Sequence, residues 1–159
     1  MRWDLIDQFE VLKKGSYARA RKSFSGGEDF FKEHFPGKPL VPQAFLIEMI
    51  AQTGGVLFGL GMNFEKEVIL AKIHDAKFSG QIAPPCAFCV EATLEEEREE
   101  GAWISGVVRQ EEKIVAQAKI LLVTFDALNE NSGKKVVFNE HFLNHFNIWE
   151  VAKLSEASQ

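Results

Sequence analysis

A histidine and a glutamate fourteen residues apart could act together as a base and an acid. His34 begins the run HFPGKPLVP, whose three prolines and one glycine predict an ordered but irregular loop. Glu48 follows in an otherwise apolar stretch, where a carboxylate is costly to bury unless it is paired or used. Desolvation would raise the pKa of Glu48 and make it a proton donor, whereas an imidazole titrates near neutrality and can accept a proton. Such a pair suits an elimination reaction.

The stretch that carries Glu48, residues 43–60, is apolar on almost every side when it is wound as a helix. A helix of this kind must be buried on almost every side. Its small residues allow another backbone to come close: Ala51, Gly54, Gly55 and Gly59. The start of the helix offers free backbone N–H groups and a positive dipole end, which could polarise a thioester carbonyl. We expect a central helix wrapped by a sheet.

Strand patterns lie on both sides of this helix. Residues 15–24 precede it, and the later strands are expected at residues 68–78, 87–98, 102–110 and 113–125, with a hairpin turn at 110–113. We also expect a short helix near residues 3–9 and a second one from about 139 to 154, after a loop at 128–135. One strand, a buried helix and an antiparallel meander predict an α+β architecture. We expect one domain over residues 1–125 and a C-terminal extension over 126–159.

Composition limits the class of protein. The chain has 159 residues, 46% of them hydrophobic, and a net charge of −5, which fits one soluble core and excludes a strongly basic nucleic-acid binder. No apolar run reaches the roughly 18 residues of a membrane span, and the N-terminus lacks the pattern of a secretory signal. Two cysteines offer no disulfide framework. We therefore expect a cytoplasmic protein that binds neither nucleic acid nor membrane.

The region from His34 to Gln52 resembles the FabZ/FabA-type 3-hydroxyacyl-(acyl carrier protein) dehydratases, which have the hot-dog fold. That family has His-Phe-Pro-Gly, a proline two places on, Pro-Gly before the helix, and Glu or Asp fourteen residues after the histidine. The chain matches this pattern at His34, Phe35, Pro36, Gly37, Pro39, Pro42 and Glu48, with Ala51 and Gln52 one turn later. Glutamate at position 48 is similar to the FabZ branch, whose members dehydrate and usually do not isomerise.

The resemblance implies a function and a site. His34 would remove the α-proton of a 3-hydroxyacyl thioester, and Glu48 would assist departure of the hydroxyl as water, giving a trans-2-enoyl thioester in fatty acid or related acyl-chain synthesis. The expected substrate contacts are Phe35, Gly37, Pro42, Gln43 and Gln52. In the family, base and acid come from different subunits, which implies a homodimer or a trimer of dimers. The expected partner is acyl carrier protein, with no cofactor and no metal.

The chain departs from the family pattern in two places. Gln43 and Pro85 stand where the family has glycine. The longer side chain of Gln43 could occupy the substrate mouth, and Pro85 removes a backbone donor. Two alternatives therefore stay open: a hot-dog thioesterase that hydrolyses the same bond, and a non-catalytic homologue that binds acyl carrier protein and partners another dehydratase.

Three further groups of residues invite a functional interpretation. A basic group could attract the acidic carrier protein: Lys13, Lys14, Arg19, Arg21 and Lys22. Cys86 and Cys89 form C-x-x-C, but residues three apart on a strand point to opposite faces and no second pair completes a zinc site, so we expect them to be packing residues. His141 and His145 have a metal-binding spacing without a third ligand in sight, and we expect no metal there.

Overall fold

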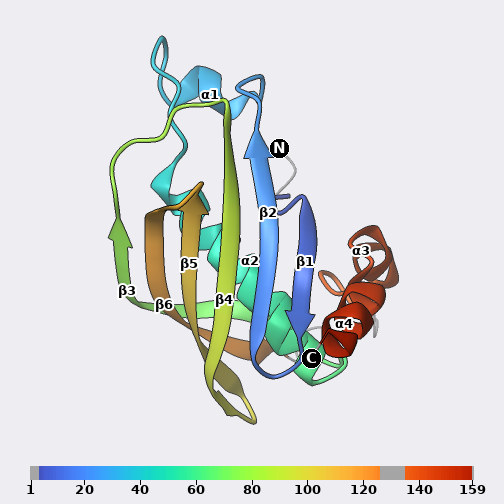
Figure 1. The fold of residues 1–159 in the computed structure, drawn as a ribbon. Helices are drawn as coiled ribbons and strands as arrows, with labels where there is room; N and C mark the ends of the chain where they lie inside the picture. The colour runs from blue at the N-terminus through green and yellow to red at the C-terminus, as the bar shows by residue number, and fades with distance from the viewer. Residues whose placement is uncertain (1–3, 126–134, 159) are drawn as a thin grey trace.

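The computed structural model describes residues 4–125 and 135–158, which form an antiparallel sheet wrapped around one long helix (Figure 1). The strands are β1 (Gln8–Lys13), β2 (Tyr17–Phe24), β3 (Glu67–Phe78), β4 (Cys86–Arg98), β5 (Gly101–Gln110) and β6 (Lys113–Phe125), in the order β1-β2-β4-β5-β6-β3. The helices are α1 (Phe30–Glu33), α2 (Gln43–Gly61), α3 (Glu140–His145) and α4 (Ile148–Ala157). This is the predicted α+β hot-dog fold, which is confirmed.

The central helix α2 lies in a trough of small residues that crosses the sheet. Paired positions on five adjacent strands are small: Ala18, Ala92, Gly106, Ala118 and Ala76. A β-carbon added to Gly106 would lie only 2.1 Å from Cγ2 of Ile50, a fully buried residue of α2. The helix therefore rests on the backbone of β5, which is what its own apolar faces require. The expectation that no apolar run is long enough to span a membrane is wrong for α2, which is long and apolar enough to do so. However, 67% of its most apolar stretch is buried within the protein, so it is a core helix.

The later strands form where the alternating pattern predicts them. In β6, Ala116, Ala118, Ile120 and Leu122 are buried. Gln117, between them, is exposed, so one face of the strand is packed and the other meets solvent. The expected hairpin turn joins β5 to β6, with Gln110 paired to Lys113 across it. Within the described residues, β3 pairs only with β6 and lies at the edge of the sheet.

The prediction of a short helix near residues 3–9 is wrong. Residues 4–7 are not helical, and Gln8–Lys13 form the edge strand β1, while residues 1–3 lie outside the described residues. Phe9 and Leu12 are both buried although three residues apart, a spacing typical of a helix. The register of β1 against β2 shifts between Phe9 and Val11, so a bulge at Glu10 turns both apolar side chains to the core.

The C-terminal helix expected at 139–154 is two helices, α3 and α4. Asn147 between them has a positive φ of 49°, which ends one helix before the next begins, and asparagine tolerates this conformation better than most residues. α4 packs against β1 (Figure 1), and its residues Ile148 and Ala152 join the core together with Phe146, the residue that follows α3. The expected loop at 128–135 lies almost wholly outside the described residues. The division at residue 125 stays a prediction.

Candidate active site

Residues 34–42, here called the motif loop, project beyond the end of the sheet next to α1 (Figure 1). Phe35 and Lys38 exchange backbone hydrogen bonds of 3.0 and 2.9 Å, which close a tight turn. Pro36 and Gly37 occupy its centre, and the φ of +74° at Gly37 is the left-handed conformation that such a turn requires of its second central residue. At the far end of the loop, Val41 N–H donates to Ile82 O at 2.8 Å. The proline-rich segment is thus ordered, as its composition predicts.

The imidazole of His34 is held by the far end of the same loop. Its Nδ1 lies 3.0 Å from the carbonyl oxygen of Leu40, and the Leu40 N–H donates to His34 O at 2.9 Å. A carbonyl oxygen can only accept, so Nδ1 carries the hydrogen in this bond. In the neutral ring, Nε2 then keeps a lone pair that can take a proton. The exposed ring of Phe35 stacks on the imidazole with centroids 4.1 Å apart.

Aromatic packing anchors the base of the motif loop. His34 ends α1, and its N–H donates to Phe30 O at 3.0 Å. The Phe30 ring meets Phe45 of α2 edge-on, with centroids 4.9 Å apart. Phe24 of β2 contacts Phe30 and also Phe31, which is buried. The histidine is therefore fixed relative to both the sheet and the first turn of α2.

Glu48 lies half-buried on α2, and its Oε1 accepts a hydrogen bond of 3.0 Å from Nε2 of Gln52, one turn further along. Both side chains line a cavity of about 540 Å³. The α2 residues of its lining share one helix face: Glu48, Ala51, Gln52, Gly55 and Val56. This volume lies within the range of small-molecule sites. The predicted carboxylate thus faces a space large enough for a substrate.

The remaining lining comes from residues that the sequence analysis did not assign to a site. β3 contributes Val68, Ile69 and Leu70, and the C-terminal segment contributes eight residues: Val136, Val137, Phe138, Asn139, His141, Phe142, His145 and Phe146. Phenylalanines at every fourth position, 138, 142 and 146, were a visible signal of one helix face. Within the described part of the chain, His34 is not among the residues that line this cavity.

The start of α2 leaves backbone donors uncapped. Pro42 is the N-cap and has no side-chain acceptor to offer, and Gln43 is the first helical residue. The side chain of Gln43 is exposed, and its φ is not positive, so this position does not need a glycine conformation. The first N–H groups of the helix therefore have no side-chain acceptor, and they lie beside the motif loop, where the resemblance places the thioester oxygen.

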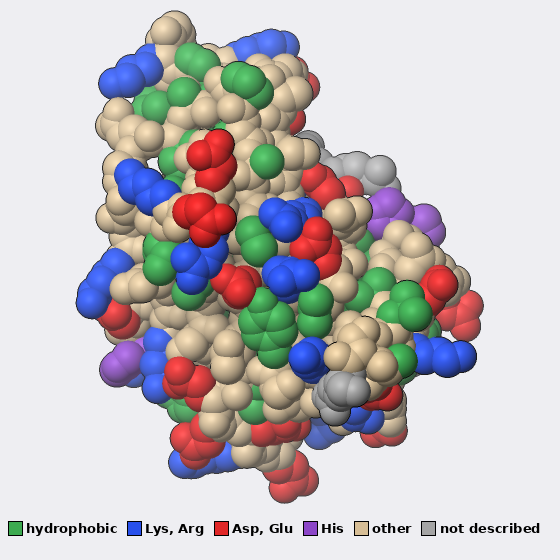
Figure 2. All heavy atoms as spheres, in the orientation of Figure 1, with side chains coloured by type: hydrophobic (Ala, Val, Ile, Leu, Met, Phe, Trp, Pro, Cys, Tyr) green, Lys and Arg blue, Asp and Glu red, His purple; other side chains and the backbone are tan. Residues whose placement is uncertain are grey.

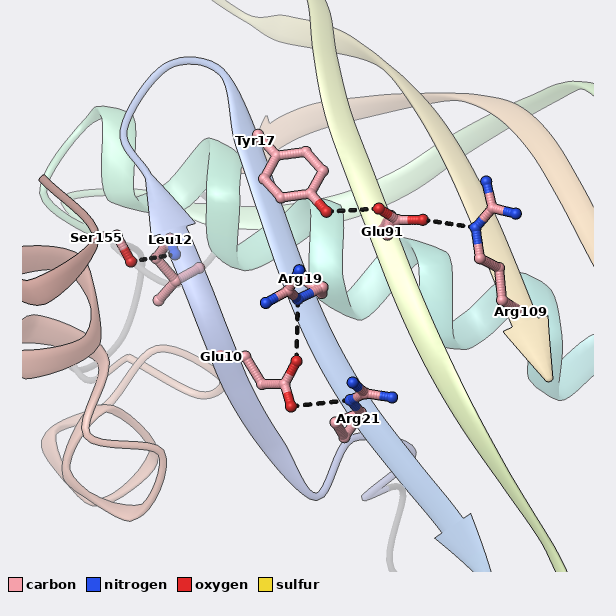
Figure 3. A network of polar contacts seen from close by, with 8 residues as sticks. All are labelled: Glu10, Leu12, Tyr17, Arg19, Arg21, Glu91, Arg109 and Ser155. Atoms are coloured by element: carbon pink, nitrogen blue, oxygen red, sulfur yellow. Dashed lines mark hydrogen bonds and ion pairs between the residues drawn. The ribbon is translucent and has the colours of Figure 1, made fainter. Parts of the chain in front are cut away.

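The basic residues of the expected docking group do not all share one face. Arg19 and Arg21 lie on the outer face of β2, and both bind the carboxylate of Glu10, at 3.0 and 2.8 Å (Figure 3). Lys22 alternates to the other face, with its side chain only 12% exposed and its Nζ 2.8 Å from Asp7. On this side of the molecule, acidic and basic side chains are interspersed (Figure 2).

A second polar network crosses the same face of the sheet. Tyr17 Oη donates to Glu91 at 2.6 Å, and Arg109 Nε donates to the other oxygen of Glu91 at 2.9 Å (Figure 3). Burial, together with this hydrogen bond, raises the pKa of Tyr17 to about 12. The bond from Tyr17 and the Arg109 guanidinium lower the pKa of Glu91 despite its partial burial. This network ties β2, β4 and β5 together far from the motif loop.

The remaining candidate residues do not form a reactive centre. Burial raises the pKa of the Cys86 and Cys89 thiols, which keeps them protonated. The rings of His141 and His145 stack with centroids 6.2 Å apart. Among residues 4–125 and 135–158, no group of three or more His, Cys, Asp or Glu side chains is placed to hold a metal ion.

Comparisons with known proteins identify the family of this chain. A family model described as a FabA-like domain matches residues 2–119. The 3-hydroxyacyl-(acyl-carrier-protein) dehydratase FabZ of Klebsiella pneumoniae is 32% identical over 120 residues, which cover 74% of this chain and 80% of that protein. The FabZ of Erwinia tasmaniensis matches with the same identity and coverage.

Solved structures share the fold at lower identity. The dehydratase heterocomplex ApeI:P from Xenorhabdus doucetiae has a TM-score of 0.66 and 15% identity, covering 79% of this chain and 85% of that chain. An uncharacterised protein from Pyrococcus horikoshii has a TM-score of 0.59 and 20% identity, covering 77% and 85%. The family model and the FabZ relatives both span most of the sequence, so this chain belongs to the FabA-like family.

Proposed function

We propose that the protein is a 3-hydroxyacyl-(acyl carrier protein) dehydratase in which His34 is the base and Glu48 the acid. The observation that carries the proposal is the hydrogen bond from His34 Nδ1 to Leu40 O, because it leaves Nε2 as a proton acceptor on a rigid loop. The carboxyl of Glu48, which faces the cavity, supplies the complementary group. The FabZ relatives support the same reaction.

The reaction balances with these two groups. His34 Nε2 takes the α-proton of the thioester, and the C–H electron pair becomes the Cα=Cβ double bond as the Cβ–O bond breaks. Glu48 acts in its protonated form and gives its proton to the departing hydroxyl, which leaves as water. Return of the proton from His34 to Glu48 resets the pair. The uncapped N–H groups at the start of α2 stabilise the charge that develops on the thioester oxygen.

The proposal requires two copies of the chain. His34 does not line the cavity of Glu48 within the described residues of one chain, which supports a homodimer that joins the two groups across copies. The edge strand β3 suits this contact, because an unpaired strand edge readily takes another strand. It also exposes apolar side chains: Ile69 at 45%, Leu70 at 36% and Ile73 at 47%.

The substrate is carried by acyl carrier protein in this proposal, and the protein is cytoplasmic. Four cations remain available for docking after Lys22 is set aside: Lys13, Lys14, Arg19 and Arg21. Glu10 neutralises part of the charge of the two arginines, so the surface is weakly positive. Reversal of charge at Arg21 should raise KM for carrier-bound substrate and spare a pantetheine thioester, because only the carrier is strongly acidic. Equal effects on both substrates would remove Arg21 from docking.

One assay separates the proposed reaction from the two alternatives. Short and long 3-hydroxyacyl carrier proteins are incubated with the enzyme, and enoyl product and free thiol are measured together. A dehydratase gives enoyl product, which is lost in His34→Ala and in Glu48→Gln but kept in Glu65→Gln, an exposed glutamate beyond α2. Free thiol without enoyl product would identify a thioesterase. Carrier binding without either product would identify a non-catalytic homologue.

A further inference from the structure

The cavity that contains Glu48 has one wall made by residues 136–146, here called the C-terminal wall. Its lining is mostly apolar: Ile6, Phe9, Val56, Val68, Leu122 and Phe146 are examples. An acyl thioester carries one large apolar part, its alkyl chain, attached to the carbons that react. A cavity lined by Glu48 at one place and by apolar side chains elsewhere therefore suits the alkyl chain of an acyl thioester.

The C-terminal wall is fastened to the core at its start. Glu67 is buried, and its two carboxylate oxygens accept hydrogen bonds from the backbone N–H groups of Val137 and Phe138, at 3.1 and 3.3 Å. The ring of Phe138 packs edge-on against Phe64 with centroids 5.0 Å apart. A β-carbon at Gly59 of α2 would lie 3.1 Å from Phe138, so the wall reaches the central helix. These contacts define one position for the wall.

Three phenylalanine rings form the apolar surface of the wall. Asn139 caps α3 by accepting the Phe142 N–H at 2.9 Å, which sets the direction of the helix. Phe142 then lies between its neighbours, with ring centroids 5.7 Å from Phe138 and 4.9 Å from Phe146. Phe146 is itself held edge-on by Phe9, at 5.4 Å. Phe138 and Phe146 are buried, whereas Phe142 is only partly buried and presents its ring to the cavity.

We propose that the C-terminal wall sets the longest acyl chain that the site accepts, with Phe142 as the specificity-determining residue. This inference rests on the proposed function, because it takes the substrate to be an acyl thioester that reacts at Glu48. The alkyl chain extends along the apolar face of α2, and its far end meets the ring of Phe142. Chains longer than this distance gain no further affinity, because the additional methylene groups cannot be buried.

The test compares Phe142→Ala and Phe142→Trp with the wild type. Binding of unreactive acyl-pantetheine amides of increasing length is measured by calorimetry, alongside kcat/KM for 3-hydroxyacyl thioesters of the same lengths. Phe142→Ala should extend the length at which affinity stops rising, by about fourfold in affinity for each methylene newly buried. Phe142→Trp should shorten it. Leu143→Ala, on the same helix but outside the cavity lining, controls for loosening of α3.

The two readouts separate this inference from the proposed function. Wild-type protein that binds the amides but forms no enoyl product would refute dehydration, and the wall would then be judged on affinities alone. Shifts of the length limit in opposite directions for the two Phe142 variants support the wall. An unchanged length limit in both variants, or the same shift in Leu143→Ala, overturns it.

Discussion

The substitution Gly106→Ala should damage both stability and activity, because α2 rests directly on this glycine. The new β-carbon would lie 2.1 Å from Cγ2 and 2.9 Å from Cγ1 of Ile50, whereas ordinary contacts begin at 3.4 Å. The helix or the strand must move by roughly 1.3 Å, the difference between 2.1 and 3.4 Å. The neighbours Ala92 and Ala118 on the adjacent strands hold β5 in place. We therefore expect most of the movement in α2.

The size of the effect follows from two independent costs. Overpacking of this kind lowers the free energy of unfolding by about 1–3 kcal/mol. Ile50 is two residues after Glu48, so the proposed acid moves with it, and a displacement near 1 Å lowers kcat/KM by about a hundredfold. Urea unfolding followed by circular dichroism measures the first quantity, and enoyl formation measures the second.

A control in the same helix gives the opposite sign. At Gly55 a β-carbon would meet nothing closer than Cγ1 of Val68 at 4.0 Å. Gly55→Ala should therefore raise the free energy of unfolding by about 0.5–1 kcal/mol, since alanine favours the helix. If Gly106→Ala unfolds at the same urea concentration as the wild type and keeps its kcat/KM, α2 does not rest on β5 and the packing argument fails.

Substitutions at three other positions test separate parts of the structure. Gly37→Ala should reduce kcat/KM and lower the free energy of unfolding by about 1 kcal/mol, because Gly37 has a φ of +74° although the space around it is open. Gly37→Asn should have a smaller effect, because asparagine tolerates a positive φ better than alanine. Equal kcat/KM values for the wild type and both variants would refute the role of this turn. Tyr17→Phe should lower the free energy of unfolding by about 1 kcal/mol at pH 8. The pKa of Tyr17 is raised from 10.0 to about 12, so the stabilisation is complete below pH 10 and lost as pH rises toward 12, and urea titrations should show the two proteins converging there. Glu67→Ala leaves the N–H of Phe138 without its acceptor and should lower the free energy of unfolding by about 1–3 kcal/mol, as measured by thermal unfolding. An unchanged free energy of unfolding would contradict the anchoring of the C-terminal wall.

Local pattern was sufficient for the centre of the fold. The unbroken apolar character of residues 43–60 required burial on every side, and the alternation in 113–125 fixed which face of that strand is packed. The spacing of His34 and Glu48, with the prolines between them, located the candidate site. These features depend on short-range periodicity and on the backbone limits of proline, both of which are visible in one sequence.

Features that depend on tertiary contacts were not predictable in the same way. The bulge at Glu10 lets Phe9 and Leu12 share a face, and a helical spacing then conceals a strand. The break at Asn147 depends on a left-handed residue where no glycine or proline gave a signal. The C-terminal wall reaches the cavity only because the buried carboxylate of Glu67 binds its backbone, a contact between residues about seventy positions apart.

The central claim is that His34 and Glu48 act as a pair across two copies of the chain. Differently tagged His34→Ala and Glu48→Gln chains are co-expressed, and the mixed dimer is purified and assayed for enoyl formation. Each parent should lose activity by about a hundredfold or more, because each lacks one member of the acid–base pair. The mixed dimer has one complete site out of two, so it should recover about half of the wild-type rate. A mixed dimer as inactive as its parents, while still folded and dimeric, would contradict the account.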